Sequence, residues 1–160
     1  MQTLANLGLG LYHSAIEIEG VEYSYGGNVE NSGSGVFTSN PGQVPNATYC
    51  CSYNMGAFRD RTKALTTLNQ VKNRFRANEY SLITQNCNHF AEAYLLELCG
   101  KRLPSYVNRL ARAGSWIQFL LPQSLKSLNP IPEGGSASMA PRDIGPKGVG
   151  PFAGKAYSLQ

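Results

Sequence analysis

Cysteine and histidine are the residues of this chain whose chemistry suits nucleophilic catalysis. The sequence holds four cysteines and two histidines among 160 residues, and Cys87 lies in the segment QNCNHF, where a helix is predicted to begin. Unpaired N–H groups and the helix dipole at such a position favour negative charge and lower the pKa of a thiol. The thiolate is the nucleophilic form of cysteine. Cys87 is therefore the candidate nucleophile.

Any mechanism that needs an imidazole base must use His13 or His89. His89 follows Cys87 by two positions, which on a helix rotates its side chain by about 200° away from the cysteine. His13 lies in a predicted strand, and catalytic Cys and His residues are neighbours in space rather than in sequence. We therefore pair Cys87 with His13. Residue types and spacing alone leave open that Cys87 is a small buried residue and that His13 is structural.

No metal or other cofactor is predicted from the remaining cysteines and histidines. Cys87 and His89 do not have the spacing of standard zinc ligands, and the adjacent Cys50 and Cys51 cannot easily bind one ion together. An even number of cysteines indicates disulfides only in a secreted chain. We interpret Cys50, Cys51 and Cys99 as free thiols in core or strand positions.

The elements that must position these residues change type along the chain. Alternation of side chains predicts strands at 8–18, 21–25, 35–39 and 47–53. Glu19-Gly20 predicts a hairpin turn between the first two strands. From residue 61 the apolar spacing becomes helical, and helices are expected at 61–75, from Asn86 or Cys87 to a left-handed cap at Gly100, and at 104–113. The predicted fold class is α+β, with a small antiparallel sheet packed against helices.

Length and composition restrict the classes of function. The 160 residues fit one domain, expected at 1–122, and the Pro-, Gly- and Ser-rich segment 123–160 is predicted to be a disordered tail. A net charge of +4 is too small to indicate a nucleic-acid binder. The apolar stretch 116–121 is far shorter than a membrane span, and residues 1–10 show no secretory signal. We expect an intracellular protein in the cytoplasm, with the nucleus left open.

Two segments resemble the PPPDE, or desumoylating isopeptidase, family. They are GLGLYHSAIEIEGVEYSYGG, which starts at Gly8, and YSLITQNCNHFAEAYLLELCGKRLPSYVNRLAR, which starts at Tyr80. The resemblance covers roughly residues 8 to 122 and is strongest to the second, deubiquitinase-like, of two animal branches. It implies a circularly permuted papain-like fold in which the histidine of the first segment and the cysteine of the second form a catalytic dyad. Those residues are His13 and Cys87.

Analogy with papain-like enzymes implies a mechanism. The Cys87 thiolate would attack a carbonyl carbon, and protonated His13 would donate to the departing lysine amine. The oxyanion needs donors, of which the Cys87 backbone N–H is the first and the side chains of Asn86 and Gln85 are candidates. Asn86 is equally suitable as a helix N-cap.

Two further features of such a site have candidates in the first half of the chain. A third polar group that orients His13 would come from the following strand, where Glu22 and Ser24 lie, and neither is assigned. The extended glycine tail of a modifier needs a narrow groove, and Gly26 and Gly27 are candidate walls. An ordinary flexible turn explains these two glycines equally well.

The predicted function is a cysteine isopeptidase that removes ubiquitin or a ubiquitin-like modifier such as SUMO from lysine side chains. The expected partners are proteins conjugated to these modifiers. A protein S-acyl thioesterase, or depalmitoylase, stays open because the same dyad serves either acyl bond. A non-catalytic modifier-binding module also stays open, because residues 1–7 are short for the strand that family members usually carry before Gly8. The preferred modifier and the oligomeric state are not predicted.

Overall fold

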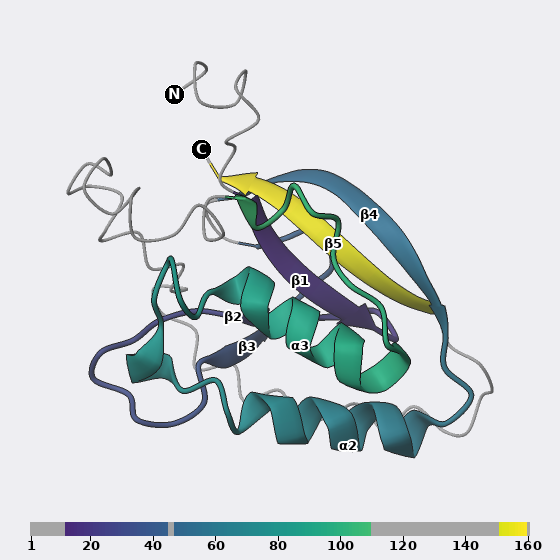
Figure 1. Ribbon diagram of the computed structural model, residues 1–160, viewed down its shortest axis with the longest axis horizontal. Coiled ribbons are helices and arrows are strands. Elements are labelled where there is room, and N and C mark those ends of the chain that lie inside the picture. The colour runs from purple at the N-terminus through teal and green to yellow at the C-terminus, as the bar shows by residue number, and fades with distance from the viewer. Residues whose placement is uncertain (1–11, 45–46, 110–150, 160) are drawn as a thin grey trace.

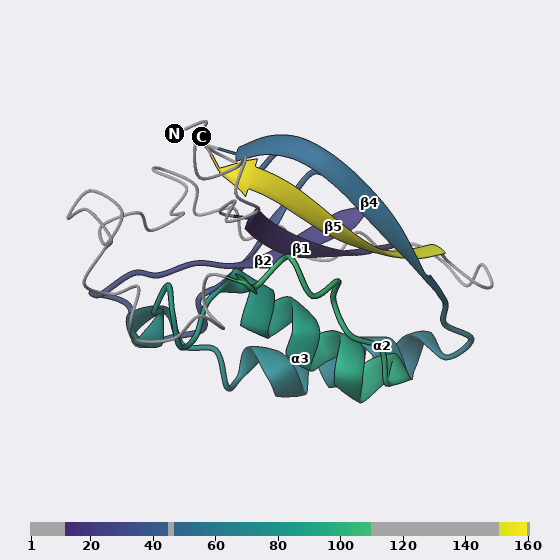
Figure 2. The ribbon, with the colours of Figure 1, turned by 45° about the horizontal axis from the view of Figure 1, so that its top comes forward.

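The computed structural model describes residues 12–44, 47–109 and 151–159. One antiparallel sheet contains β1 (Tyr12–Ile18), β2 (Val21–Tyr25), β3 (Val36–Ser39), β4 (Ala47–Ala57) and β5 (Pro151–Leu159). The helical elements are α2 (Arg61–Lys72), the short 3-10 helix η1 (Ala77–Glu79) and α3 (Cys87–Cys99). Both α-helices lie on the same side of the sheet (Figure 1 and Figure 2). The predicted α+β class is confirmed.

The strands β1 and β2 form the predicted hairpin. Both turn residues have positive φ, 50° at Glu19 and 78° at Gly20, as a two-residue type I′ turn requires. Ile18 pairs with Val21 directly across the turn. Every second residue of β1, counted back from Ile18, therefore turns its backbone N–H and C=O groups toward β2. The pairing of β1 with β2 begins only at Ile16, so the first part of β1 has no β2 partner.

The strand β5 lies in the interior of the sheet, whose order is β3-β2-β1-β5-β4. It appears in yellow between β1 and β4 in Figure 1 and pairs with the whole of β1, from Tyr12 opposite Ser158 to Ile18 opposite Phe152. The structure therefore differs from the expected disordered tail at 151–159, and the rest of that tail lies outside the described residues. Composition suggested disorder because large apolar side chains are few, whereas an interior strand is held by backbone hydrogen bonds on both edges.

Two other elements differ in extent from the prediction. The strand β4 continues beyond the expected end at residue 53 to Ala57, and its register with β5 shifts twice. The helix expected at 104–113 is only partly described, and residues 105–108 form turns in which the Val107 N–H donates to the Pro104 oxygen at 3.1 Å. No helix within the described ranges is long and apolar enough to cross a membrane.

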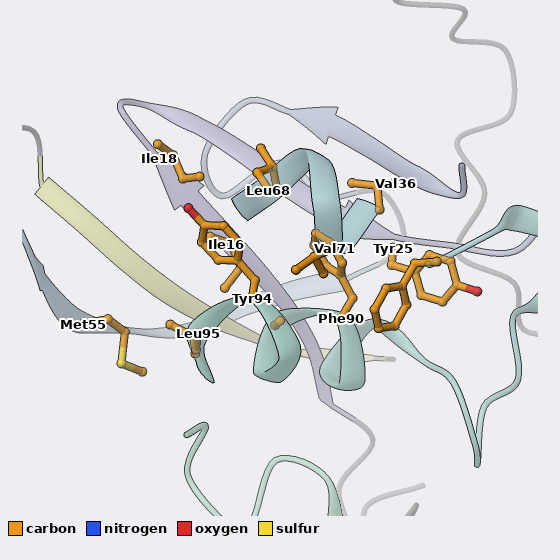
Figure 3. Close-up of a cluster of buried hydrophobic side chains, with 12 residues drawn as sticks. Ile16, Ile18, Tyr25, Val36, Met55, Leu68, Val71, Phe90, Tyr94 and Leu95 are labelled. Carbon is orange, nitrogen blue, oxygen red and sulfur yellow. The ribbon is translucent and has the colours of Figure 1, made fainter. Parts of the chain in front are cut away.

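The hydrophobic core lies between the sheet and the two α-helices. Side chains from α2, α3, β1, β2, β3 and β4 meet there (Figure 3). The Tyr94 hydroxyl donates to the Ala64 backbone oxygen at 3.2 Å and so joins α3 to α2. As predicted, α3 ends at Gly100, which has the left-handed φ of 68°. The cluster consists of Ile16, Ile18, Tyr25, Val36, Met55, Leu68, Val71, Phe75, Phe90, Ala91, Tyr94 and Leu95.

Candidate active site

The N-terminus of α3 is fixed to the first part of β1. Asn88 donates from Nδ2 to the backbone oxygen of Tyr12 at 3.0 Å and to that of Val107 at 3.3 Å. Tyr12 and Ser14 turn their backbone groups toward the β2 side of the sheet, where β2 is not yet paired. The start of α3 takes this place at the edge of β1. Cys87, the first residue of α3, therefore lies beside the backbone of β1.

The thiol of Cys87 is surrounded by hydrogen-bond donors. Cys87 is only 4% exposed, and burial raises the pKa of its thiol to about 11. Hydrogen bonds to the sulfur act against this increase in the pKa. They come from the backbone N–H groups of Ser14, Asn88 and Cys87 itself and from the hydroxyl of Tyr80. The Ser14 N–H belongs to the peptide unit that joins Ser14 to His13. The thiol therefore lies next to the main chain of His13.

The imidazole of His13 is fully buried, and its Nε2 lies 3.0 Å from Oγ of Ser24 on β2. Both side chains point to the same face of the β1–β2 hairpin. Burial lowers the pKa of His13 to about 4, so the ring is neutral at pH 7. Of the two polar residues of β2 that were left unassigned, Ser24 contacts the histidine. The buried Glu22 instead accepts a hydrogen bond from the Gly42 N–H at 3.1 Å.

Asn86 and His89 stabilise the start of α3. Oδ1 of Asn86 accepts from the backbone N–H groups of Asn88 at 2.9 Å and His89 at 3.1 Å, which makes Asn86 the N-cap. Its Nδ2 donates to the Leu82 oxygen at 2.8 Å and to Oδ1 of Asn108 at 3.3 Å. The ring nitrogens of His89 lie against Asn86 and Asn108, in agreement with the prediction that His89 points away from Cys87. The Asn86 amide is thus used by the cap rather than directed at the thiol.

The other sequence candidates do not gather around Cys87. Gln85 donates from Nε2 to the Arg74 backbone oxygen at 3.4 Å. Gly26 and Gly27 are buried, and the Gly26 N–H donates to the Gly35 oxygen at 3.0 Å. A Cβ added to Gly35 would lie 2.4 Å from the Gly26 oxygen, so these two backbones pack directly on each other. Both glycines are therefore covered in this structure, and their place in the walls of a substrate groove stays a prediction.

Sequence reasoning missed three residues of this site. Asn88 ties the helix to β1, Asn108 contacts both Asn86 and His89, and Tyr80 faces the thiol. The polar residues that flank the cysteine in NCN were a visible signal for Asn88. No local signal marks the other two, because they reach the site from outside the helix.

Among the residues that the structure describes, no group of three or more His, Cys, Asp or Glu side chains could hold a metal ion. A surface pocket lined by residues such as Met55, Phe58 and Leu98 lies at the C-terminal end of α3. Thirteen helical residues separate the two ends by about 18 Å, so this pocket is not part of the Cys87 site.

The chain shows clear similarity to known proteins. The model of the PPPDE putative peptidase domain matches residues 1–125. The chain is 36% identical over 129 residues to DeSI-like protein At4g17486 of Arabidopsis thaliana, covering 79% of this chain and 57% of that protein. It is 36% identical over 121 residues to Desumoylating isopeptidase 1 homolog of Caenorhabditis elegans, covering 72% of this chain and 36% of that protein.

A third relative is DeSI-like protein sdu1 of Schizosaccharomyces pombe, 34% identical over 110 residues, which cover 68% of this chain and 55% of that protein. No solved structure matches the chain significantly. The chain spans less than two thirds of the length of each of these relatives. Because the domain model covers most of its residues, this chain belongs to the PPPDE putative peptidase family.

Proposed function

We propose that this protein is a cysteine isopeptidase that cleaves the bond between a ubiquitin-like modifier and a lysine side chain, with Cys87 as nucleophile and His13 as base. The observation that carries the proposal is the position of the thiol beside the His13–Ser14 peptide unit at the start of a helix. Membership of a peptidase family supports the reaction class. One relative is named a desumoylating isopeptidase homolog, so SUMO conjugates are the first substrates to test and ubiquitin conjugates the second.

The charge state of the resting pair follows from burial. The pKa of Cys87 is raised to about 11 and that of His13 is lowered to about 4. At pH 7 both side chains are therefore uncharged, and the reaction begins with a proton transfer from the thiol to the imidazole. Because Cys87 is 4% exposed, the thiol has to become accessible before it can meet a substrate carbonyl.

The reaction then proceeds through an acyl-enzyme. His13 takes the thiol proton while Sγ of Cys87 forms a bond to the carbonyl carbon of the modifier's C-terminal glycine. We assign the hydrogen of Nε2 to a bond donated to Ser24, which leaves Nδ1 to exchange the proton. The Cys87 backbone N–H at the helix start donates to the oxyanion.

Two bond-breaking steps complete the cycle. The tetrahedral intermediate collapses as its C–N bond breaks, and His13 passes its proton to the departing lysine amine. Water then attacks the thioester carbon while His13 accepts one of its protons. The C–S bond breaks, the modifier leaves as a free acid, and Cys87 regains its hydrogen.

The test uses SUMO and ubiquitin that carry a C-terminal electrophile. We would incubate each probe with the wild-type chain, Cys87→Ser, His13→Ala and the control Cys99→Ser, which removes an exposed thiol at the other end of α3. Intact mass reports the covalent adduct. We expect an adduct on the wild type and on Cys99→Ser, none on Cys87→Ser, and a rate at least tenfold lower on His13→Ala.

Other results would contradict the proposal. An adduct that persists on Cys87→Ser places the nucleophile elsewhere. A folded wild type that reacts with neither probe, but hydrolyses a small acyl thioester through Cys87, is a thioesterase. A folded protein that turns over neither substrate, and binds a modifier equally well as Cys87→Ser, is a binding module.

A further inference from the structure

Tyr80 reaches the nucleophile from a loop that the backbone closes tightly. Ser81 and Gln85 form a two-way backbone bridge in which each N–H donates to the other residue's oxygen at 3.0 Å. The residues just outside this bridge are Tyr80 and Asn86, so they lie opposite each other. Because Asn86 is the N-cap of α3, the bridge places Tyr80 at the helix start, beside Cys87.

The ring of Tyr80 is held in place by the core. It packs on the ring of Tyr25, with centroids 5.2 Å apart and planes inclined by 47°. Tyr25 is itself fully buried, and its hydroxyl donates to the Arg76 backbone oxygen at 2.7 Å. Because the aromatic packing fixes the ring, the Tyr80 hydroxyl has a defined position when the thiol ionises.

The hydroxyl of Tyr80 lies near enough to the Cys87 thiol for each group to shift the pKa of the other, and it remains protonated. Burial raises the pKa of Tyr80 well above its usual range, and the neighbouring Cys87 raises it further. The same contact lowers the pKa of the Cys87 thiol, as donation to a thiolate does. At neutral pH the Tyr80 hydroxyl can therefore donate a hydrogen bond, but it cannot replace His13 as the base.

We propose that Tyr80 is a catalytic residue that donates a hydrogen bond to the Cys87 sulfur and stabilises the thiolate during attack. This role rests on the proposed isopeptidase function for its place in the cycle. The backbone donors at the sulfur hold their positions through the fold, whereas the phenol is a side-chain donor that substitution can remove alone. Its contribution adds to that of the backbone N–H groups of Ser14, Asn88 and Cys87 against the burial that opposes ionisation of this thiol.

The test compares Tyr80→Phe with the matched control Tyr94→Phe. Both variants delete one hydroxyl from a tyrosine packed in the same core, and the Tyr94 hydroxyl donates to Ala64 rather than to the thiol. The rate of iodoacetamide alkylation is measured against pH on the peptide that contains Cys87, by mass spectrometry. We expect Tyr80→Phe to shift the midpoint up by about one pH unit and to slow alkylation at pH 8 about tenfold. Tyr94→Phe stays within twofold of wild type.

Several outcomes would overturn the proposal. They are a Tyr80→Phe profile that superimposes on wild type, equal slowing by Tyr94→Phe, or a wild-type thiol that is never alkylated at any pH. With a cleavable modifier substrate, the expected change is a fall of about tenfold in kcat with an unchanged KM. If the alkylation shift appears while no modifier is cleaved, the donor role stands and the isopeptidase function fails. If cleavage occurs and Tyr80→Phe changes nothing, the inference alone fails.

Discussion

The contact between His13 and Ser24 allows a quantitative test of the proposed base. Both residues are fully buried, and a single hydrogen bond of 3.0 Å joins Nε2 to Oγ. Ser24→Ala removes the partner and leaves a buried ring nitrogen without it, which costs about 1–3 kcal/mol of unfolding free energy. Without this hydrogen bond the His13 ring loses its fixed orientation, and we expect kcat to fall on the order of 10- to 100-fold. A displacement of a reacting group by about 1 Å can lower a rate by about 100-fold.

The assay combines urea unfolding with steady-state cleavage of a modifier substrate. The matched control is Ser39→Ala, because the Ser39 hydroxyl is buried but makes no hydrogen bond within the described part of the chain. We expect this control to leave both stability and kcat close to wild type. Ser24→Thr keeps the hydroxyl and is expected to retain most of the rate.

The reasoning is refuted if Ser24→Ala and Ser39→Ala behave alike in both measurements. A loss of stability in Ser24→Ala without a fall in kcat would show that Ser24 is only structural. A similar fall in kcat for Ser24→Thr would show that the hydroxyl is not what the histidine needs.

Three more perturbations test the way the site is held. The pKa of His13 is about 4 in the folded protein and 6.5 in the unfolded chain, so between these values the unfolded state binds an extra proton and stability is lost as pH falls. We expect the free energy of unfolding to fall between pH 7 and pH 5 by about 2 kcal/mol more in wild type than in His13→Gln. An equal fall in both proteins would contradict the pKa shift. Asn88→Ala removes the hydrogen bonds to Tyr12 and Val107, and we expect the free energy of unfolding in urea to fall by about 1–3 kcal/mol. We also expect the variant to lose its reaction with the electrophilic modifier probes. An unchanged reaction would show that these hydrogen bonds are not needed for catalysis. Ala156→Pro removes a backbone N–H from β5 between β1 and β4 and is expected to cost about 3 kcal/mol or more in the same assay; a loss below about 0.5 kcal/mol would mean that β5 pairing is not what matters.

Local patterns in the sequence were sufficient to predict the elements that carry Cys87 and His13. Side-chain alternation and Glu19-Gly20 identified the hairpin, and Gly100 identified the end of α3, since each signal acts within a few residues of the structure it specifies. The start of α3 at Cys87 was equally readable. The pairing of Cys87 with His13 rested on elimination of His89 together with the family resemblance. The observed contacts of His89 lie within the helix cap and with Asn108.

The contacts that complete the site depend on the tertiary fold and could not be predicted in this way. Alternation puts Glu22 and Ser24 on the same face of β2. Their different contacts, Glu22 with Gly42 and Ser24 with His13, come from the tertiary fold. Tyr80 reaches the thiol through a backbone bridge, which side-chain type does not reveal. The two glycines expected in an open groove, Gly26 and Gly27, are covered because Gly35 packs on Gly26.

The interior position of β5 also has a consequence for the order of folding. The residues that pair across β1 and β5 are far apart in the sequence, as with His13 opposite Tyr157, and such distant contacts are slow to form because a long loop must close first. During synthesis, a chain that has reached residue 109 contains the residues of the hairpin and of both helices but not those of β5, which joins β1 to β4. The strand that carries His13 therefore gains its β5 neighbour only after residue 159 has been synthesised, so this pairing is expected to form later than the β1–β2 hairpin.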